Sequence, residues 1–137
     1  MPRTTEALFD RYGPRYRWAV MLTAMLSTIS AVLSATIINV AIPDIMGTFG
    51  IDQIEAQWLS AGYLAAMTST MLLVDYCIKA FGQRTTLVSM LALFLAGSLL
   101  GGFAQSTDVM IAARLLQGTA AGIMQPLAMV CVFQVFA

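Results

Sequence analysis

Residues 18–43 read WAVMLTAMLSTISAVLSATIINVAIP, and none of these 26 side chains carries a charge. A helix needs about 20 apolar residues to cross the hydrocarbon core of a bilayer, so this stretch is long enough to do so. The run is too long for the apolar region of a cleavable signal peptide, and no small-residue cleavage site is evident before Pro43. The stretch therefore predicts a transmembrane helix.

Three further uncharged stretches follow the first. The 137 residues include seven basic and seven acidic side chains, whereas apolar residues make up 59%. The charges cluster, and between the clusters lie uncharged stretches at residues 18–43, 56–74, 85–107 and 115–137. We predict an all-α membrane protein with a tail at 1–17 and four transmembrane helices at about 18–43, 56–74, 85–107 and 109–137. This composition excludes an ordinary soluble domain, a disordered tail and a nucleic-acid binder.

The chain lacks the side chains that most enzymes use. It contains no histidine, and its acids lie between or at the ends of the spans, without the spacing of metal ligands. No glycine-rich phosphate loop or nucleophile elbow is present. Cys77 and Cys131 are predicted on the cytoplasmic side, where a disulfide is not expected. We expect no enzyme, no cofactor and no metal site.

The basic residues predict the orientation of the chain, because they mark the cytoplasmic side when they lie in short loops. The tail holds four arginines, and the 75–84 loop holds Lys79 and Arg84. The 44–55 loop and the turn near residue 106 hold no basic residue. We predict a multi-pass protein of the cytoplasmic (inner) membrane with its N-terminus in the cytoplasm. Residues 4–12 of the tail suit a short helix on the membrane surface and a frayed end equally well.

Hydroxyl groups form a stripe along the first span. Thr23, Ser27, Ser30 and Ser34 fall within about 60° of one another on a helix. Such a stripe suits a water-filled cavity or a polar helix contact. Serine and threonine also bond carbonyls of their own helix, one turn back, so the residues alone leave both interpretations open.

The fourth span holds the one charge that is embedded in an apolar stretch. Arg114 lies six residues after Asp108, about 9 Å inside the outer end. A guanidinium at that depth costs about 2.5 kcal/mol or more unless it is paired or hydrated. It must face the bundle interior or water, or extend back to the outer interface. Gln117, Gly118 and Gln125 share its helix face, and we interpret this face as part of a substrate or proton pathway.

Other polar and small residues complete the pattern. Thr36 and Asn39 lie on the opposite face of the first span, where we expect the Asn39 amide to bond a neighbouring helix. Pairs of glycines four residues apart, Gly97 with Gly101 and Gly118 with Gly122, predict close helix packing. Pro126 is expected to bend the fourth span.

Three segments carry a resemblance to a transporter family. Residues 33–43, LSATIINVAIP, resemble the first-span signature of the fourteen-span drug:proton antiporters (EmrB/QacA type) of the major facilitator superfamily. Residues 114–122, RLLQGTAAG, are similar to the superfamily's fourth-span motif, and residues 79–87, KAFGQRTTL, to its loop motif between spans two and three. The resemblance covers nearly all of the chain after Arg17. It implies a truncated N-terminal part of a six-helix half.

The chain departs from that family at informative positions. Ser34 stands where the signature has an aspartate that is a candidate proton carrier, and a hydroxyl cannot titrate near neutral pH. In the loop motif, Asp75 stands for a glycine and Lys79 for an aspartate that helps to latch the cytoplasmic side. The cytoplasmic gating loop of Asp75, Lys79, Gly82 and Arg84 is therefore expected to latch weakly or with reversed charge.

Ser34 and Arg114 are both expected about 9–14 Å from the outer boundary, at a similar depth. No span of the chain offers Arg114 a carboxylate. Its candidate partners are Gln117, backbone carbonyls, water, an anionic substrate or an acid in missing spans. Our hypothesis is that Arg114 lines the central cavity and that the first span does not carry proton coupling.

The resemblance implies part of a proton-coupled secondary transporter that exports drugs or other small organic molecules. Such transporters bind substrate between two halves, so four spans alone are expected to be incompetent for transport. The implied partners are the lipid bilayer, a small amphipathic organic substrate, the missing C-terminal spans or another membrane chain, and a periplasmic adaptor. Two alternatives stay open: a small four-span exporter that acts as a dimer, and a non-transporting membrane subunit.

Overall fold

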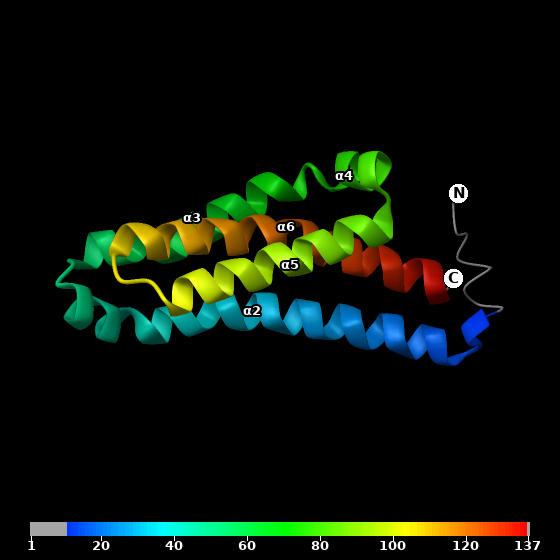
Figure 1. Cartoon of the computed structure of the whole chain (residues 1–137), viewed down its shortest axis with the longest axis horizontal. Coiled ribbons are helices and arrows are strands. Elements are labelled where there is room, and N and C mark those ends of the chain that lie inside the picture. Colours follow the sequence, from blue (N-terminus) through cyan, green and yellow to red (C-terminus); the bar gives the residue numbers. More distant parts are fainter. Residues whose placement is uncertain (1–10, 137) are drawn as a thin grey trace.

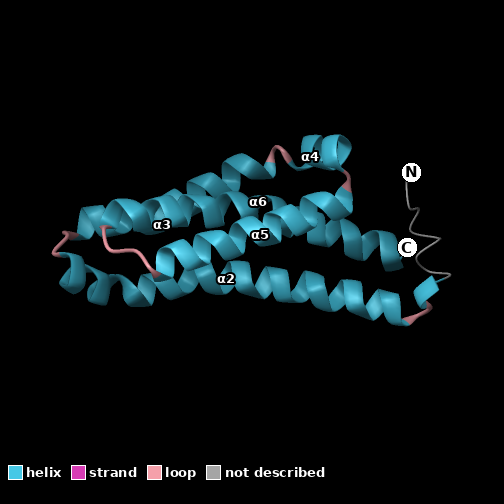
Figure 2. Ribbon diagram, viewed as in Figure 1, coloured by secondary structure: helices cyan, strands magenta, loops and turns pink. Residues whose placement is uncertain are grey.

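The computed structural model describes residues 11–136, which form an elongated bundle of helices (Figure 1). The helices are α2 (Arg15–Phe49), α3 (Gln53–Met71), α4 (Val74–Phe81), α5 (Gln83–Gly102) and α6 (Thr107–Phe136). Helices and loops account for all of the described part of the chain (Figure 2). The surface helix expected at 4–12, and most of the tail at 1–17, lie outside the described residues.

Three helices, α2, α5 and α6, are long and apolar enough to cross a membrane. The pair α3 and α4 passes the same test together, although the two helices are bent by 59° at a short break. The described residues thus contain three candidate spans, or four if the bent pair is one span. The predicted all-α membrane fold is confirmed.

Helix ends differ from the ends of the uncharged stretches. α2 continues through Pro43 to Phe49, and Gly50 ends it in the left-handed conformation at φ 64°, with its N–H donating to the Met46 carbonyl. Asp52 then caps α3, because its carboxylate accepts the Glu55 N–H at 2.8 Å. The connection between α2 and α3 is therefore only three residues long.

The segment expected to be a loop at 75–84 is largely helical. Asp75 and Lys79 lie in α4, and Arg84 lies in the first turn of α5. Gly82 separates the two helices at φ 79°, a conformation that side chains with a Cβ rarely adopt. A search for uncharged stretches does not detect this helix, because Asp75 and Lys79 lie within it. Val74, Cys77 and Ile78 nevertheless recur at helical spacing and face the bundle.

α6 is the central helix, in contact with α2, α3 and α5. Its glycines allow the approach: a Cβ at Gly118 would collide with the Tyr63 carbonyl of α3, and a Cβ at Gly122 would collide with the Met67 carbonyl. Gly97 of α5 faces the Gln117 side chain in the same way. The predicted close packing is confirmed. It places α3 and α5 on either side of α6.

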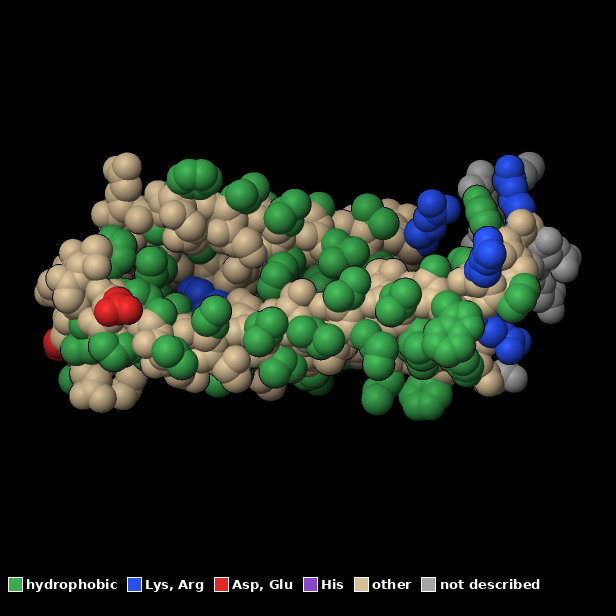
Figure 3. All heavy atoms as spheres, turned by 90° about the horizontal axis from the view of Figure 1, so that it is seen from below, with side chains coloured by type: hydrophobic (Ala, Val, Ile, Leu, Met, Phe, Trp, Pro, Cys, Tyr) green, Lys and Arg blue, Asp and Glu red, His purple; other side chains and the backbone are tan. Residues whose placement is uncertain are grey.

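The surface separates into apolar sides and charged ends. In Figure 3, basic side chains gather at the right-hand end and acidic side chains at the left-hand end, with hydrophobic groups between them. The start of α2, the whole of α4 and the end of α6 share the basic end (Figure 1). Large exposed side chains such as Leu26, Ile37 and Leu95 cover the sides. A bundle with apolar sides and charged ends suits a bilayer.

Gly122→Ala should destabilise the bundle, because the added Cβ meets the α3 backbone, which cannot move without separating α3 from α6. We expect the midpoint of thermal unfolding in detergent, Tm, to fall by about 4 °C or more. Gly47→Ala is the matched control, since a Cβ there meets nothing within 4 Å and alanine favours a helix. Equal Tm values for the two variants would contradict the packing.

Candidate functional site

Arg114 faces the interior of the bundle and is only 6% exposed. Its Nη1 donates to Ser34 Oγ at 2.8 Å and to Gln117 Oε1 at 2.9 Å. Its Nη2 donates to the Ser34 carbonyl at 2.7 Å, and its Nε donates to the Leu59 carbonyl at 3.4 Å. These partners come from α2, α3 and α6, so one side chain joins three helices. All of them are uncharged.

The guanidinium is stabilised by backbone carbonyls that can also accept their usual helical hydrogen bonds. A carbonyl oxygen has two lone pairs, so the oxygens of Ser34 and Leu59 can each accept a guanidinium N–H besides a helical hydrogen bond. A hydrogen bond to a charged group contributes more than one between neutral groups. The site thus surrounds a full positive charge with partial negative charges from three helices.

Tyr63 covers the flat face of the guanidinium. Its ring centroid lies 4.3 Å from Arg114 Cζ, within the range of a cation–π interaction. The Tyr63 hydroxyl donates to the Ala31 carbonyl of α2 at 2.9 Å, and the whole residue is 1% exposed. Tyr63 therefore belongs to the site together with the residues that hydrogen-bond Arg114.

Gln117 extends the network to α5. Its Oε1 accepts from Arg114, while its Nε2 donates to Ser98 Oγ at 2.8 Å. The Ser34 hydroxyl also lies 3.4 Å from Gln117 Oε1. Within residues 11–136, every buried side-chain nitrogen and oxygen has a hydrogen-bond partner. The amide thus satisfies both of its ends and links Arg114 to a fourth helix.

The structure places the other predicted site residues of α2 away from Arg114. Thr36 is exposed and donates to the carbonyls of Val32 and Leu33 in its own helix. Asn39 is exposed as well, and its Oδ1 accepts from the Ser60 hydroxyl of α3 at 2.9 Å. The expected bond from Asn39 to a neighbouring helix is confirmed, but neither side chain joins the Arg114 network.

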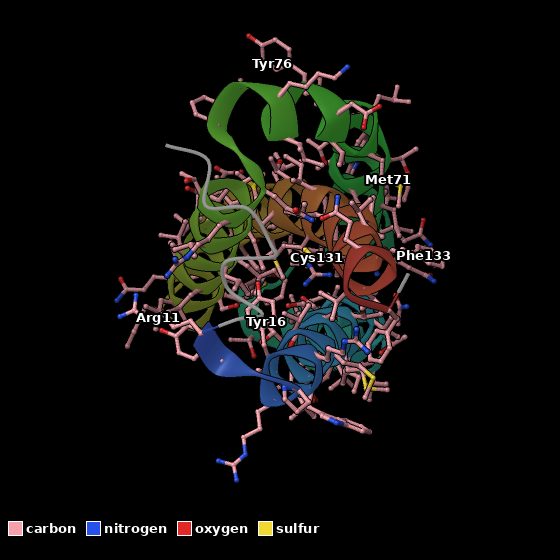
Figure 4. The ribbon with its side chains drawn as sticks, turned by 90° about the vertical axis from the view of Figure 1, so that its right-hand side faces the viewer. Arg11, Tyr16, Met71, Tyr76, Cys131 and Phe133 are labelled. Atoms are coloured by element: carbon pink, nitrogen blue, oxygen red, sulfur yellow. The ribbon has the colours of Figure 1, made fainter. Side chains whose placement is uncertain are left out.

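Gln125 also lies apart from Arg114, about 16 Å further along α6. It lines an open groove of about 720 Å³ between α2 and α6. The groove is mostly apolar and is lined by Ala24, Met25, Thr28, Ile29, Met71, Gln125, Pro126, Ala128, Met129, Val132 and Phe133. Figure 4 looks along the helices from the basic end and shows Met71 and Phe133 on the same side of the bundle.

Both interpretations of the hydroxyl stripe of α2 apply, because its residues bond carbonyls of their own helix and also line a hollow. The hydroxyls of Thr23 and Ser27 donate to carbonyls four residues back. The same two residues and Ser30 line a smaller hollow of about 240 Å³, closed on the other side by apolar side chains that include Leu91 of α5. Ser34 is the one member of the stripe that reaches Arg114.

The four residues of the gating segment lie at the basic end, far along the bundle from Arg114. Asp75, Lys79 and Arg84 are exposed, and Gly82 forms the turn between α4 and α5. Tyr76, between the two charged residues of α4, points away from the bundle (Figure 4). The structure therefore separates the gating segment from the arginine network.

Sequence reasoning missed three contributors to the site: the Tyr63 ring, the Leu59 carbonyl and Ser98. Ser98 could have been found, because it follows Gly97 in the small-residue pair that faces α6. A backbone carbonyl carries no signal in the sequence. Tyr63 gave a weak one, since its neighbour Gly62 begins a row of small residues in the second span.

Comparison with known proteins places the chain in a family. The Major Facilitator Superfamily profile matches residues 24–137. The chain is 32% identical over 118 residues to the uncharacterized MFS-type transporter YhcA of Bacillus subtilis (strain 168), which covers 86% of this chain and 22% of that protein. No solved structure matches the chain significantly.

Two further relatives have names that state a function. The multidrug transporter protein MdtP of Bacillus subtilis (strain 168) is 30% identical over 128 residues, which are 93% of this chain and 24% of that protein. The puromycin resistance protein pur8 of Streptomyces alboniger is 29% identical over 120 residues, 88% of this chain and 24% of its own length. The chain thus spans about a quarter or less of these relatives. From the profile match and the helical bundle together, the chain belongs to the Major Facilitator Superfamily.

Proposed function

We propose that this chain forms one wall of a proton-coupled secondary transporter that exports drugs or other small organic molecules across the cytoplasmic membrane. Relatives named for multidrug transport and puromycin resistance support the direction and the substrate class. The likeness of residues 33–43 to the fourteen-span antiporter signature supports proton coupling. Because the chain spans only part of its relatives, the remaining walls come from further spans or from another membrane chain.

The buried Arg114 network is the observation that carries this proposal. A packing contact between apolar helices needs no charge, and an embedded guanidinium is costly. Here it is held by four hydrogen bonds within the bundle and meets no acid in the part of the chain that the structure describes. We assign Arg114, Ser34, Gln117 and Gly118 to the part of the substrate or proton pathway that interacts with charged groups.

The groove beside Gln125 is the second part of the proposed pathway. Its volume and apolar lining suit a small amphipathic organic molecule. Methionine side chains from three helices line it, and methionine adapts its shape to different ligands. Thr36 and Asn39 lie nearer the outer end of α2, where they would form the polar exit of the pathway.

Proton coupling has to be carried outside the first span. Ser34 occupies the family's aspartate position, and its hydroxyl accepts from Arg114 without titrating near neutral pH. Arg114 itself stays protonated at any physiological pH. We therefore assign the coupling proton to an acid outside the first span, with Arg114 as the fixed positive charge.

Arg114→Ala, made in the transporter that contains this chain, should reduce ethidium efflux from energised cells about tenfold or more. The reason is that it removes the charge and its four hydrogen bonds. Fluorescence of intracellular ethidium, with and without a protonophore, measures the effect. Arg11→Ala is the control, as it removes an exposed arginine at the basic end. Undiminished, protonophore-sensitive efflux by Arg114→Ala would refute the role of Arg114.

The N-terminus and the gating segment are proposed to face the cytoplasm, since the start of α2 and the gating segment both lie at the basic end of the bundle. In a background with Cys77→Ser and Cys131→Ser, we expect Ser106→Cys to react with a membrane-impermeant maleimide in intact cells. Lys79→Cys should react only after the cells are permeabilised. The reverse pattern would invert the orientation, and labelling of both positions in intact cells would contradict a spanning bundle.

Residues 1–137 expressed alone should not export ethidium, because they provide one wall of the pathway. Cells that contain this segment in their membranes should accumulate ethidium as control cells do, by the same fluorescence measurement. Protonophore-sensitive efflux by the segment alone would instead favour a small exporter that acts as a dimer. Recovery of the segment in a crosslinked complex with a second membrane protein would favour a non-transporting subunit.

A further inference from the structure

We propose that Tyr63 is a positioning residue for Arg114, and that it takes the place of a carboxylate counter-ion, which Arg114 does not have among the described residues. The functional part of this inference rests on the proposed role of Arg114 in transport, whereas the structural part stands on the geometry alone. Tyr63 belongs to α3, Arg114 to α6, and the Tyr63 hydroxyl bonds α2.

The hydrogen bonds to Arg114 act in the plane of the guanidinium. The oxygens of Ser34, Gln117 and Leu59 approach the N–H groups along the edges of the planar group. They do not cover its flat faces. The Tyr63 ring covers one face at 4.3 Å, where the negative π-face of the ring meets the positive charge.

The Tyr63 hydroxyl fixes the ring in place. It donates to the Ala31 carbonyl at 2.9 Å, and Ala31 lies three residues before Ser34, about one turn away on α2. The same turn of α2 therefore supplies an anchor for the ring and two acceptors for the guanidinium. Tyr63 cannot rotate off Arg114 without breaking a buried hydrogen bond, which is costly in a low-dielectric interior.

Gly118 explains why the ring can reach this position. Arg114 and Gly118 are four residues apart, on one face of α6. Gly118 lies against the Tyr63 carbonyl, where no Cβ fits, so the α3 backbone lies directly against α6 at Tyr63. From there the ring lies over the guanidinium one turn earlier. The four-residue spacing of Arg114 and Gly118 in α6 thus allows one residue of α3, Tyr63, to contact both.

A double-mutant cycle tests this assignment without depending on transport. Tyr63→Leu removes the ring, and it is compared in the native background and in Arg114→Gln, which removes the charge. If the ring acts on the charge, Tyr63→Leu should lower the detergent Tm by about 4 °C more with Arg114 present than with Gln at that position. Leu127→Ala, a truncation of a fully buried side chain about 20 Å further along α6, should cost the same Tm in both backgrounds.

Tyr63→Phe separates the ring from its hydroxyl. It keeps the face that covers the guanidinium, so ethidium efflux should stay within about threefold of the unmodified chain, against a loss of about tenfold for Tyr63→Leu. If Tyr63→Leu fails to reach the membrane, Tyr63→Met supplies the same comparison. Rescue by phenylalanine supports a role for the ring, which a general loss of packing would not restore selectively.

The possible results separate this inference from the proposed function. Equal Tm losses for Tyr63→Leu in both backgrounds would overturn it, as would a Tyr63→Phe variant as impaired as Tyr63→Leu. A Tm coupling specific to Arg114, together with undiminished ethidium efflux by every variant of the transporter that contains this chain, would support Tyr63 as the positioning residue. That last result would at the same time refute the proposed transport role.

Discussion

The structure depends on the burial of one positive charge without a negative one. A guanidinium in an apolar bundle is stable only if oxygens surround it, and no single helix can provide enough of them, because its own carbonyls lie along its axis. Arg114 therefore requires α2 and α3 to approach α6 at the same depth. The order of the described helices in space, with α6 between its neighbours, follows from this requirement as much as from apolar packing.

Small residues and charge solve one problem together. Without water in the bilayer core, helices associate through close packing and hydrogen bonds rather than through the hydrophobic effect. The glycines of α6 bring the α3 backbone near enough for the Leu59 carbonyl and the Tyr63 ring to reach Arg114. Replacing Arg114 would leave close packing that holds no charge. Replacing the glycines would leave a charge without acceptors within reach.

Much of the fold could be predicted from the spacing of charges, and part of the site from depth. Ser34 and Arg114 were expected at one depth from simple counting, and they meet. Depth alone could not identify Tyr63 and Ser98, because their contribution depends on how α3 and α5 are rotated about their axes, and only Gly97, next to Ser98, indicates the rotation of α5. Apolar residues surround these helices on nearly all sides, so periodicity does not define the rotation. α4 was missed because its exposed charges interrupt the uncharged stretch, although its apolar face is regular.

The break between α3 and α4 has a mechanical consequence. α4 packs mainly on α5, with a smaller contact to α6, and it turns by 59° from the axis of α3. Leu72 and Leu73 form the break, so the helix axis is not continuous between α3 and α4. A tilt of α3 would change the contacts around Arg114 at one end of the bundle without forcing the same tilt on α4, which packs on α5 at the other end. One continuous helix would instead transmit such a movement along its whole length.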